Sequence, residues 1–229
     1  MESLYPFLYA GETDVSAVLD QVRASTVAKA AEITQLRQAV SDADGDRLAG
    51  CAQAMTDRFA AGARLLAFGN GGSATDAQQI VTLFLHPGGT ARPLPALSLA
   101  SDPSVLTALA NDVGPDVIFA RQVGAFGRAC DIVIGLSTSG NSDNLLRAFD
   151  EASRRGMLTI GIAGYSGGKM AELDSMDYLF VAPSASVHRI QEAQTTIYHA
   201  LWELCQAALA SRAGAAGAAG AAGAGQVTP

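Results

Sequence analysis

The chain has 229 residues, of which 49% are hydrophobic and 16% charged, so it can bury a sizeable core and is not globally disordered. Its formal net charge of -7 argues against general binding to nucleic acid or to an anionic membrane surface. No apolar run reaches the roughly 18 residues of a membrane span, and the acidic first residues do not resemble a signal peptide. The 3 scattered cysteines lack metal-ligand spacing and suit a reducing compartment, so we expect a cytoplasmic protein.

Helical and strand-like segments alternate along the chain. Apolar residues at helical spacing predict two N-terminal helices, over about 14–40 and 46–61, and a last helix over about 188–211. Short apolar runs predict buried strands at 64–68, 94–99, 131–136, 158–163 and 178–181. Strands that alternate with helices predict an α/β fold, in which helices cover both faces of a parallel sheet.

Composition divides the chain only near its end. No break interrupts residues 1–211, which we predict to be a single domain. Residues 213–225 are only Ala and Gly, and each Gly costs a helix about 1 kcal/mol relative to Ala, so we expect residues 212–229 to be a flexible tail. The first helix carries apolar side chains that need burial, which predicts N-terminal helices packed in a homo-oligomer. These side chains are Val15, Val18, Leu19, Val22 and Val27.

Two loops, 69–73 and 137–142, each join a predicted strand to a helix. Their glycines allow backbone N–H groups to converge, and a helix N-terminus adds unpaired donors and a partial positive charge. Either loop alone is explained equally well as a tight turn or a helix cap, and neither matches a nucleotide-binding motif. Together, at the carboxyl edge of a parallel sheet, they predict a phosphate site built without Lys or Arg.

Four motifs resemble the phosphoheptose isomerase family, whose members are sugar-isomerase (SIS) domain proteins. They are Gly69-Asn-Gly-Gly-Ser-Ala-Thr-Asp-Ala-Gln78, Leu106-Thr-Ala-Leu-Ala-Asn-Asp112, Ser137-Thr-Ser-Gly-Asn-Ser142 and Arg189-Ile-Gln-Glu192. The resemblance implies a SIS-type fold with a five-stranded parallel sheet flanked by helices, and a homotetramer. It also implies a ligand such as sedoheptulose 7-phosphate, and interconversion of ketose and aldose phosphates by proton transfer through an enediol.

The resemblance also implies the site residues. The substrate-binding set is Asn70, Gly71, Gly72, Ser73, Asn111, Asp112, Ser137, Thr138, Ser139, Ser142 and Gln191. The Ser/Thr cluster would hold the phosphate, while Asn111, Asp112 and Gln191 would bind sugar hydroxyls. His199 matches the family's catalytic histidine and lies two helical turns after Gln191, on the same helix face.

Two positions depart from the family pattern. Leu83 stands where the family has its acid/base glutamate, and Gln79 replaces a histidine. With Gln191 and His199 these positions form the zinc site of metal-binding members, so we predict no zinc and no other cofactor. Leu83 cannot carry a proton, and general acid/base catalysis is typically worth roughly 10²–10⁴-fold in rate.

Three functions therefore remain open. The first is an aldose–ketose isomerase in which His199 works without its usual partner. The second is a non-catalytic phosphosugar sensor, or a tetrameric scaffold for a protein partner. The third is a purely structural assembly with a vestigial pocket. The intact loops argue against the third and the two replaced residues against the first, so the sequence favours a phosphosugar-binding member of the family.

Overall fold

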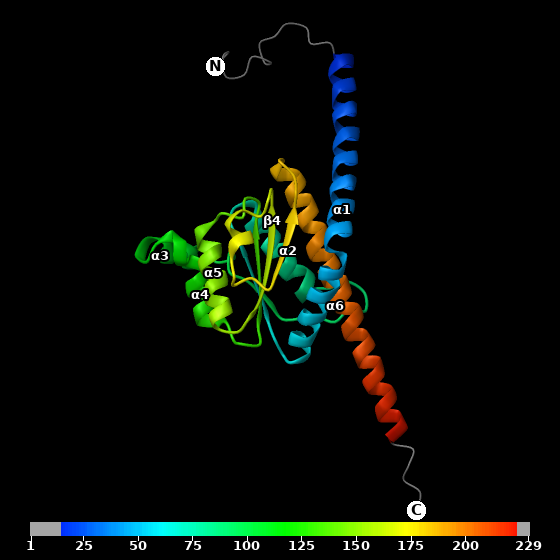
Figure 1. Ribbon diagram of the computed structural model, residues 1–229, viewed down its shortest axis with the longest axis vertical. Coiled ribbons are helices and arrows are strands. Elements are labelled where there is room, and N and C mark those ends of the chain that lie inside the picture. Colours follow the sequence, from blue (N-terminus) through cyan, green and yellow to red (C-terminus); the bar gives the residue numbers. More distant parts are fainter. Residues whose placement is uncertain (1–14, 224–229) are drawn as a thin grey trace, which may run out of the picture. The chain divides into compact units, whose positions relative to one another are not determined.

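The computed structural model describes residues 15–223, and the chain divides into two compact units, Met1–Gln35 and Leu36–Pro229. The first residues, which we predict not to be a signal peptide, lie outside the described residues. Within the first unit, residues 15–35 are helical, and the apolar side chains predicted to need burial are exposed. In the second unit, a five-stranded sheet lies between two layers of helices (Figure 1).

One continuous helix, α1 (Val15–Ala60), replaces the two predicted N-terminal helices. The segment between the two predicted helices, residues 41–46, contains Ser, Asp and Gly, which are weak helix formers. In the structure Val40 and Leu48 both enter one core, and Asp44 pairs with Arg47 at 2.9 Å. Core packing on both sides of the weak segment therefore outweighs its low helix propensity.

The predicted strands are confirmed, with ends shifted by a residue or two. They are β1 (Leu65–Gly69), β2 (Ala96–Ser98), β3 (Ile132–Ser137), β4 (Leu158–Gly164) and β5 (Tyr178–Ala182). All neighbours pair in parallel, in the order β2-β1-β3-β4-β5. The structure thus has the predicted five-stranded parallel sheet flanked by helices.

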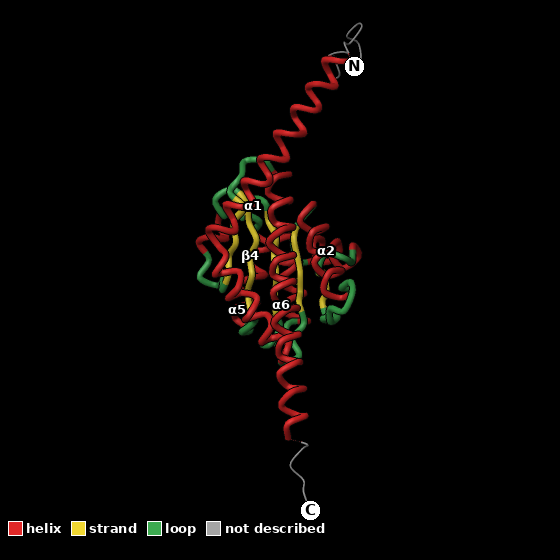
Figure 2. Tube along the Cα trace, turned by 90° about the vertical axis from the view of Figure 1, so that its right-hand side faces the viewer, coloured by secondary structure: helices red, strands yellow, loops and turns green. Residues whose placement is uncertain are grey.

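Helices cover both faces of this sheet. Figures 1 and 2 show α2 (Gly72–Leu85) and α6 (Val187–Gly223) on one side. On the other side lie α4 (Ile118–Phe126) and α5 (Asp143–Arg154), with α3 (Pro103–Asp112) at the edge. Two short 3-10 turns complete the unit, η2 (Pro115–Val117) before α4 and η3 (Gly168–Glu172) after β4.

The alternation of side chains along β1 divides the interior into two cores. Leu65 and Ala67 face a core shared with α2, α6 and the second half of α1. Leu66 and Phe68 face the other core, where the Phe68 ring lies 5.4 Å from Phe119 and 5.3 Å from Phe149, between ring centroids. Because both faces of each central strand are buried, these strands are continuous apolar runs in the sequence.

The last helix is longer than predicted, since α6 continues to Gly223 rather than ending near residue 211. Alanine has the highest helix propensity and the segment contains no proline, so its spaced glycines weaken the helix without ending it. The flexibility of residues 212–229, and a domain boundary at 211, stay predictions; residues 224–229 lie outside the described part. Among the described residues, no helix is both apolar enough and long enough to span a bilayer.

Candidate functional site

The two predicted loops lie side by side at the carboxyl edge of the sheet. β1 and β3 are neighbours, with Gly69 in register with Leu136, so loop 69–73 and loop 137–142 leave adjacent strands. The strand order reverses direction at this pair: β2 lies next to β1 toward one edge of the sheet, and β4 lies next to β3 toward the other edge. Ligands of open parallel sheets bind at such a switch point.

Both site helices begin without a side-chain cap. In the described part of the chain no side chain accepts a hydrogen bond at the N-cap of α2, Gly71, or at that of α5, Ser142. By contrast, Asp102 caps α3 by accepting hydrogen bonds from the backbone N–H groups of Ser104 and Val105. Because the first N–H groups of a helix have no partner within it, the start of α5 offers donors to an anion. At the start of α2, the N–H groups of Ser73 and Ala74 donate to Asn70 O and Gly71 O, both at 3.0 Å.

A pair of side-chain amides ties the two loops together. Asn70 Nδ2 donates to Asn144 Oδ1 at 2.9 Å, and Asn144 Nδ2 donates back to Asn70 Oδ1 at 3.0 Å. Asn144 lies in the first turn of α5 and was not singled out from the sequence. This reciprocal pair fixes the spacing of the two helix starts, which a phosphate must match to contact both.

A third loop, residues 164–170, braces loop 137–142 from the β4 side. Met170 N–H donates to Gly140 O at 3.0 Å, and Lys169 N–H donates to Asn141 Oδ1 at 2.9 Å. Gly140 has φ +68°, and a Cβ there would lie 1.9 Å from Gly167 O. Within the loop, Ser137 Oγ accepts from Gly140 N–H at 3.0 Å. Position 140 therefore requires glycine, and loop 137–142 is held in one shape.

Loop 69–73 packs directly against Gln191 of α6. A Cβ on Gly72 would lie 2.4 Å from Gln191 Nε2, so a side chain at position 72 would displace the Gln191 carboxamide. Gln191 Nε2 also donates to Asp76 Oδ2 at 3.4 Å. Burial raises the pKa of Asp76, although this hydrogen bond opposes the rise. The structure thus brings the side chains of Gln191 and Asp76 together beside loop 69–73.

The remaining predicted residues of these two loops lie where the motifs place them. Ser73 is buried, and its N–H donates to Asn70 O at 3.0 Å. Thr138, Ser139 and Ser142 are half-buried along loop 137–142. The structure therefore gathers hydroxyl groups, glycines and two helix starts around one short stretch of the sheet edge.

The positions of the zinc ligands implied by the family do not suit a metal. Leu83 has no donor atom and packs against the core formed with α1 and α6. The carboxamide oxygen of Gln79 accepts a hydrogen bond from the buried Tyr198 hydroxyl at 3.1 Å. The described residues include no group of three His, Cys, Asp or Glu side chains that would hold an ion. This donor set does not fit a zinc ion, which takes four N, S or O ligands.

His199, the predicted catalytic residue, lies in a different hollow. It is exposed, and its ring centroid lies 5.2 Å from that of Tyr198. It lines a cavity of about 340 Å³ together with Arg37 and Glu203. Among the described residues, no hydrogen bond, ion pair or ring contact joins His199 to the two loops, so the single chain does not bring His199 and the phosphate loop together.

Asn111 and Asp112 also remain apart from the loops within one chain. They end α3, a helix with no buried residue, and both are exposed. Asn111 Nδ2 donates to Asp112 Oδ1 at 2.8 Å, and no described hydrogen bond links either residue to loop 69–73 or loop 137–142. Their predicted contact with a sugar stays a prediction.

Comparisons with known proteins agree with the four motifs. Residues 30–164 match the family model of the SIS domain. The phosphoheptose isomerase of Nitratidesulfovibrio vulgaris Hildenborough is 40% identical over 183 residues, which cover 80% of this chain and 87% of that protein. That of Aquifex aeolicus is 45% identical over 152 residues, covering 66% and 78% respectively.

Solved structures show the same relationship. The phosphoheptose isomerase of Neisseria gonorrhoeae is similar with a TM-score of 0.74 and 34% identity, over 81% of this chain and 99% of that chain. The Francisella tularensis phosphoheptose isomerase has the same TM-score, 0.74, with 31% identity, over 82% and 98%. This chain is a SIS-domain protein and belongs to the phosphoheptose isomerase family.

Proposed function

We propose that this chain binds a phosphorylated sugar of the sedoheptulose 7-phosphate type and does not isomerise it at the rate of an intact family site. The observation that carries the proposal is the pair of uncapped helix starts on adjacent strands, held together by Asn70 and Asn144. A phosphate there would accept hydrogen bonds from the first N–H groups of α5 and from the hydroxyls of Thr138, Ser139 and Ser142.

The chemistry of the other half of the pocket favours binding over proton transfer. Isomerisation requires a group that removes a proton from one carbon and returns it to the next. Leu83 is half-buried and packs against the core, and His199 lines another cavity together with Glu203. Gln79 and Gln191 present carboxamides, which bind hydroxyl groups but do not exchange protons at neutral pH. Without the acid/base pair, turnover is expected to fall by roughly 10²–10⁴-fold.

The test is proton and phosphorus NMR of the protein with sedoheptulose 7-phosphate in D₂O, with EDTA present. We expect the phosphorus signal of the ligand to broaden, with no deuterium entering the carbon next to the carbonyl beyond a protein-free control. Ser139→Ala should weaken binding by about tenfold, the loss of one hydrogen bond to a charged group. Ser153→Ala, an exposed serine at the other end of α5, is the matched control.

Deuterium exchange that depends on the protein would overturn the proposal that the chain does not isomerise the sugar. Loss of that exchange in His199→Ala would then identify His199 as the base. Absence of broadening would overturn the binding proposal itself. Leu83→Glu sharpens the outcome because it restores a carboxyl group at the family position. We expect this variant to gain exchange, while Leu83→Gln, of similar size and polarity but without an acid, does not.

We also propose that the protein assembles as a homotetramer. The support is the row of exposed apolar side chains on residues 15–27, of which Val15 and Val27 are 67% and 71% exposed. Analytical ultracentrifugation should give a species of four times the 23.4 kDa chain mass. The double variant Val18→Lys with Val22→Lys should lower the fraction of chains in this species. A monomer at micromolar concentration would contradict this assembly.

A further inference from the structure

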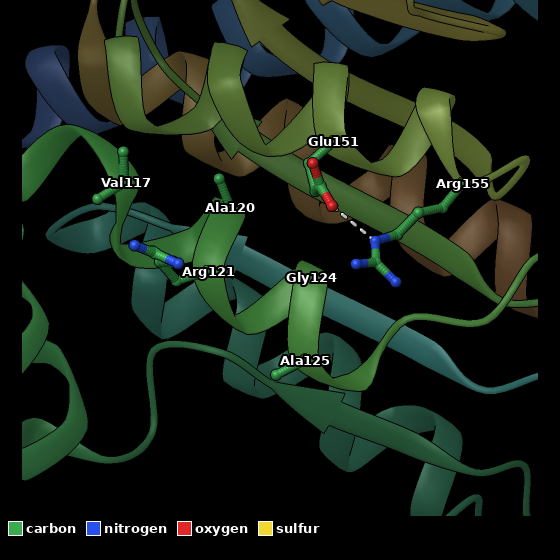
Figure 3. A pocket seen from close by; sticks show the side chains of 7 residues that line it. All are labelled: Val117, Ala120, Arg121, Gly124, Ala125, Glu151 and Arg155. Carbon is green, nitrogen blue, oxygen red and sulfur yellow. Dashed lines mark hydrogen bonds and ion pairs between the residues drawn. The ribbon is translucent and has the colours of Figure 1, made fainter.

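A second hollow, of about 410 Å³, lies between α4 and α5, apart from the two phosphate loops (Figure 3). α5 begins at Asp143, directly after loop 137–142, and Arg155 of the hollow follows its last residue. At 1.5 Å per residue, about 18 Å of helix separates the two ends. The hollow is therefore not a part of the sugar-phosphate site.

Small residues of α4 line one side of the hollow, beside Arg121. Ala120, Gly124 and Ala125 line it, and Figure 3 shows them along one helix opposite Glu151 and Arg155. A Cβ on Gly124 would lie 3.5 Å from both Arg155 Nη2 and Glu151 Oε1. The missing side chain at Gly124 thus leaves room beside the guanidinium of Arg155.

Both oxygens of Glu151 are already paired with arginines of the same helix. Arg155 Nε donates to Glu151 Oε1 at 2.6 Å, and Arg154 pairs with Oε2. Arg155 Nη1 lies 3.5 Å from Gly127 O, and Nη2 faces Gly124 with no hydrogen-bond partner among the described residues. One carboxylate is therefore shared by two guanidinium groups, and Nη2 of Arg155 can donate hydrogen bonds to a ligand.

Arg121, on the opposite wall, adds a further positive charge. It is exposed, and within residues 15–223 no ion pair or side-chain hydrogen bond is assigned to it. Asp116, just before α4, pairs instead with Arg147 at 3.8 Å. Arg121 lies in the first turns of α4, where the helix dipole disfavours a cation. The hollow thus concentrates guanidinium charge on a chain whose net charge is -7.

We propose that this hollow binds the oxyanion group of a small metabolite, a phosphate or carboxylate, between Arg121 and Arg155. Guanidinium groups bind such oxyanions through paired, charge-assisted hydrogen bonds. The volume lies within the roughly 300–1,000 Å³ of small-molecule sites. The inference does not depend on the proposed sugar-phosphate function, because it uses none of the residues of the two loops.

The experiment is methyl NMR of the full chain with labelled alanine, titrated at constant ionic strength with inorganic phosphate in one arm and citrate in the other. Ala120 and Ala125 report on the hollow, and Ala74 reports on loop 69–73, where phosphate is also expected to bind. The variants are Arg121→Gln and Arg155→Gln. Arg128→Gln is the matched control, since Arg128 is exposed and lies outside the hollow.

We expect saturable shifts of Ala120 and Ala125 that weaken about tenfold in Arg121→Gln and persist in Arg128→Gln. Saturation by phosphate alone would assign a phosphoryl group to the ligand, and saturation by citrate alone a carboxylate. Shifts that do not saturate with either anion, or that are equal in Arg121→Gln and Arg128→Gln, would reduce the effect to general charge screening and overturn the site. Shifts at Ala74 alone would overturn it as well.

Discussion

The polar groups at the two ends of strand β3 differ in how they are hydrogen-bonded. At its start, the buried carboxylate of Asp131 accepts hydrogen bonds from Arg64 N–H at 2.8 Å, Arg64 Nη2 at 2.7 Å and Arg128 N–H at 3.1 Å. At its end, loop 137–142 carries neutral hydroxyls and the uncapped start of α5. At one end a buried carboxylate is bound by a guanidinium and two backbone N–H groups, and at the other the start of α5 has no side-chain cap.

This difference separates the part that holds the fold from the part that we propose to bind the ligand. Burial alone would raise the pKa of Asp131, but the hydrogen bonds from Arg64 and Arg128 outweigh it and hold the pKa below its usual value. The charge at the amino edge thus stabilises the pairing of β1 with β3. At the carboxyl edge the ion pair beside loop 137–142, between Lys169 and Asp143 at 3.2 Å, is exposed. The two edges can therefore be broken independently.

The largest expected effect is on stability, from Asp131→Ala. Removing the carboxylate leaves Arg64 and two backbone donors without their partner, which we expect to cost about 3 kcal/mol, since Arg64 keeps some contact with solvent. Urea unfolding measures it, and sugar-phosphate affinity should remain. Asp116→Ala, which breaks the exposed 3.8 Å pair with Arg147, should cost under about 1 kcal/mol. Equal losses in the two variants would contradict the anchoring role of Asp131.

The next effect is on binding, from Gly140→Ala. The new methyl would meet Gly167 O, and the residue would be held at φ +68°, so we expect a loss of about 1–3 kcal/mol in stability and of phosphate binding. Gly156→Ala is the matched control. It imposes the same kind of strain at φ +74°, but its Cβ meets only Ala129 at 3.8 Å, far from the loop. If Gly156→Ala also abolished binding, the loss would reflect general destabilisation.

The sheet and the phosphate loops could be predicted from the sequence because each depends on local signals. Runs such as Leu65–Gly69 are apolar throughout since both faces are buried, and the glycine and serine loops follow directly after such runs. Adjacent strands at a parallel edge then bring loops together whatever their distance along the chain. The resemblance to the family implied the five-stranded SIS fold and the expected ligand.

Contacts between distant segments could not be predicted. The Asn70–Asn144 pair joins residues of ordinary polarity, and nothing in their local sequence indicates it. The bracing loop 164–170 carries a local signal, the Gly167-Gly168 pair after a strand. The continuity of α1 through 41–46 depends on core contacts at Val40 and Leu48, and local propensity alone indicated a break there.

A smaller effect is expected from Asn144→Ala. The variant removes two reciprocal hydrogen bonds at an exposed site, which we expect to cost about 1 kcal/mol and to lower phosphate affinity a few-fold by releasing the spacing of the loops. A double-mutant cycle with Asn70→Ala isolates the pair, because each single variant already breaks both bonds. Additive losses in the double variant would mean that the two amides act separately and that the loops are spaced by other contacts.

The smallest effect is the pH dependence contributed by Asp131. Because its pKa is lower in the folded chain than in the unfolded chain, its stabilisation is fully present above the unfolded value of about 4 and is lost as pH falls through the folded value. Asp131→Asn removes this titration, so the difference in unfolding free energy between wild type and variant should stay constant from pH 7 to about 5 and narrow below about 4. The comparison within one pair of proteins cancels the titration of the other carboxylates. A difference that persists unchanged at pH 3 would mean that Asp131 stabilises the sheet edge through shape and neutral hydrogen bonds rather than through charge.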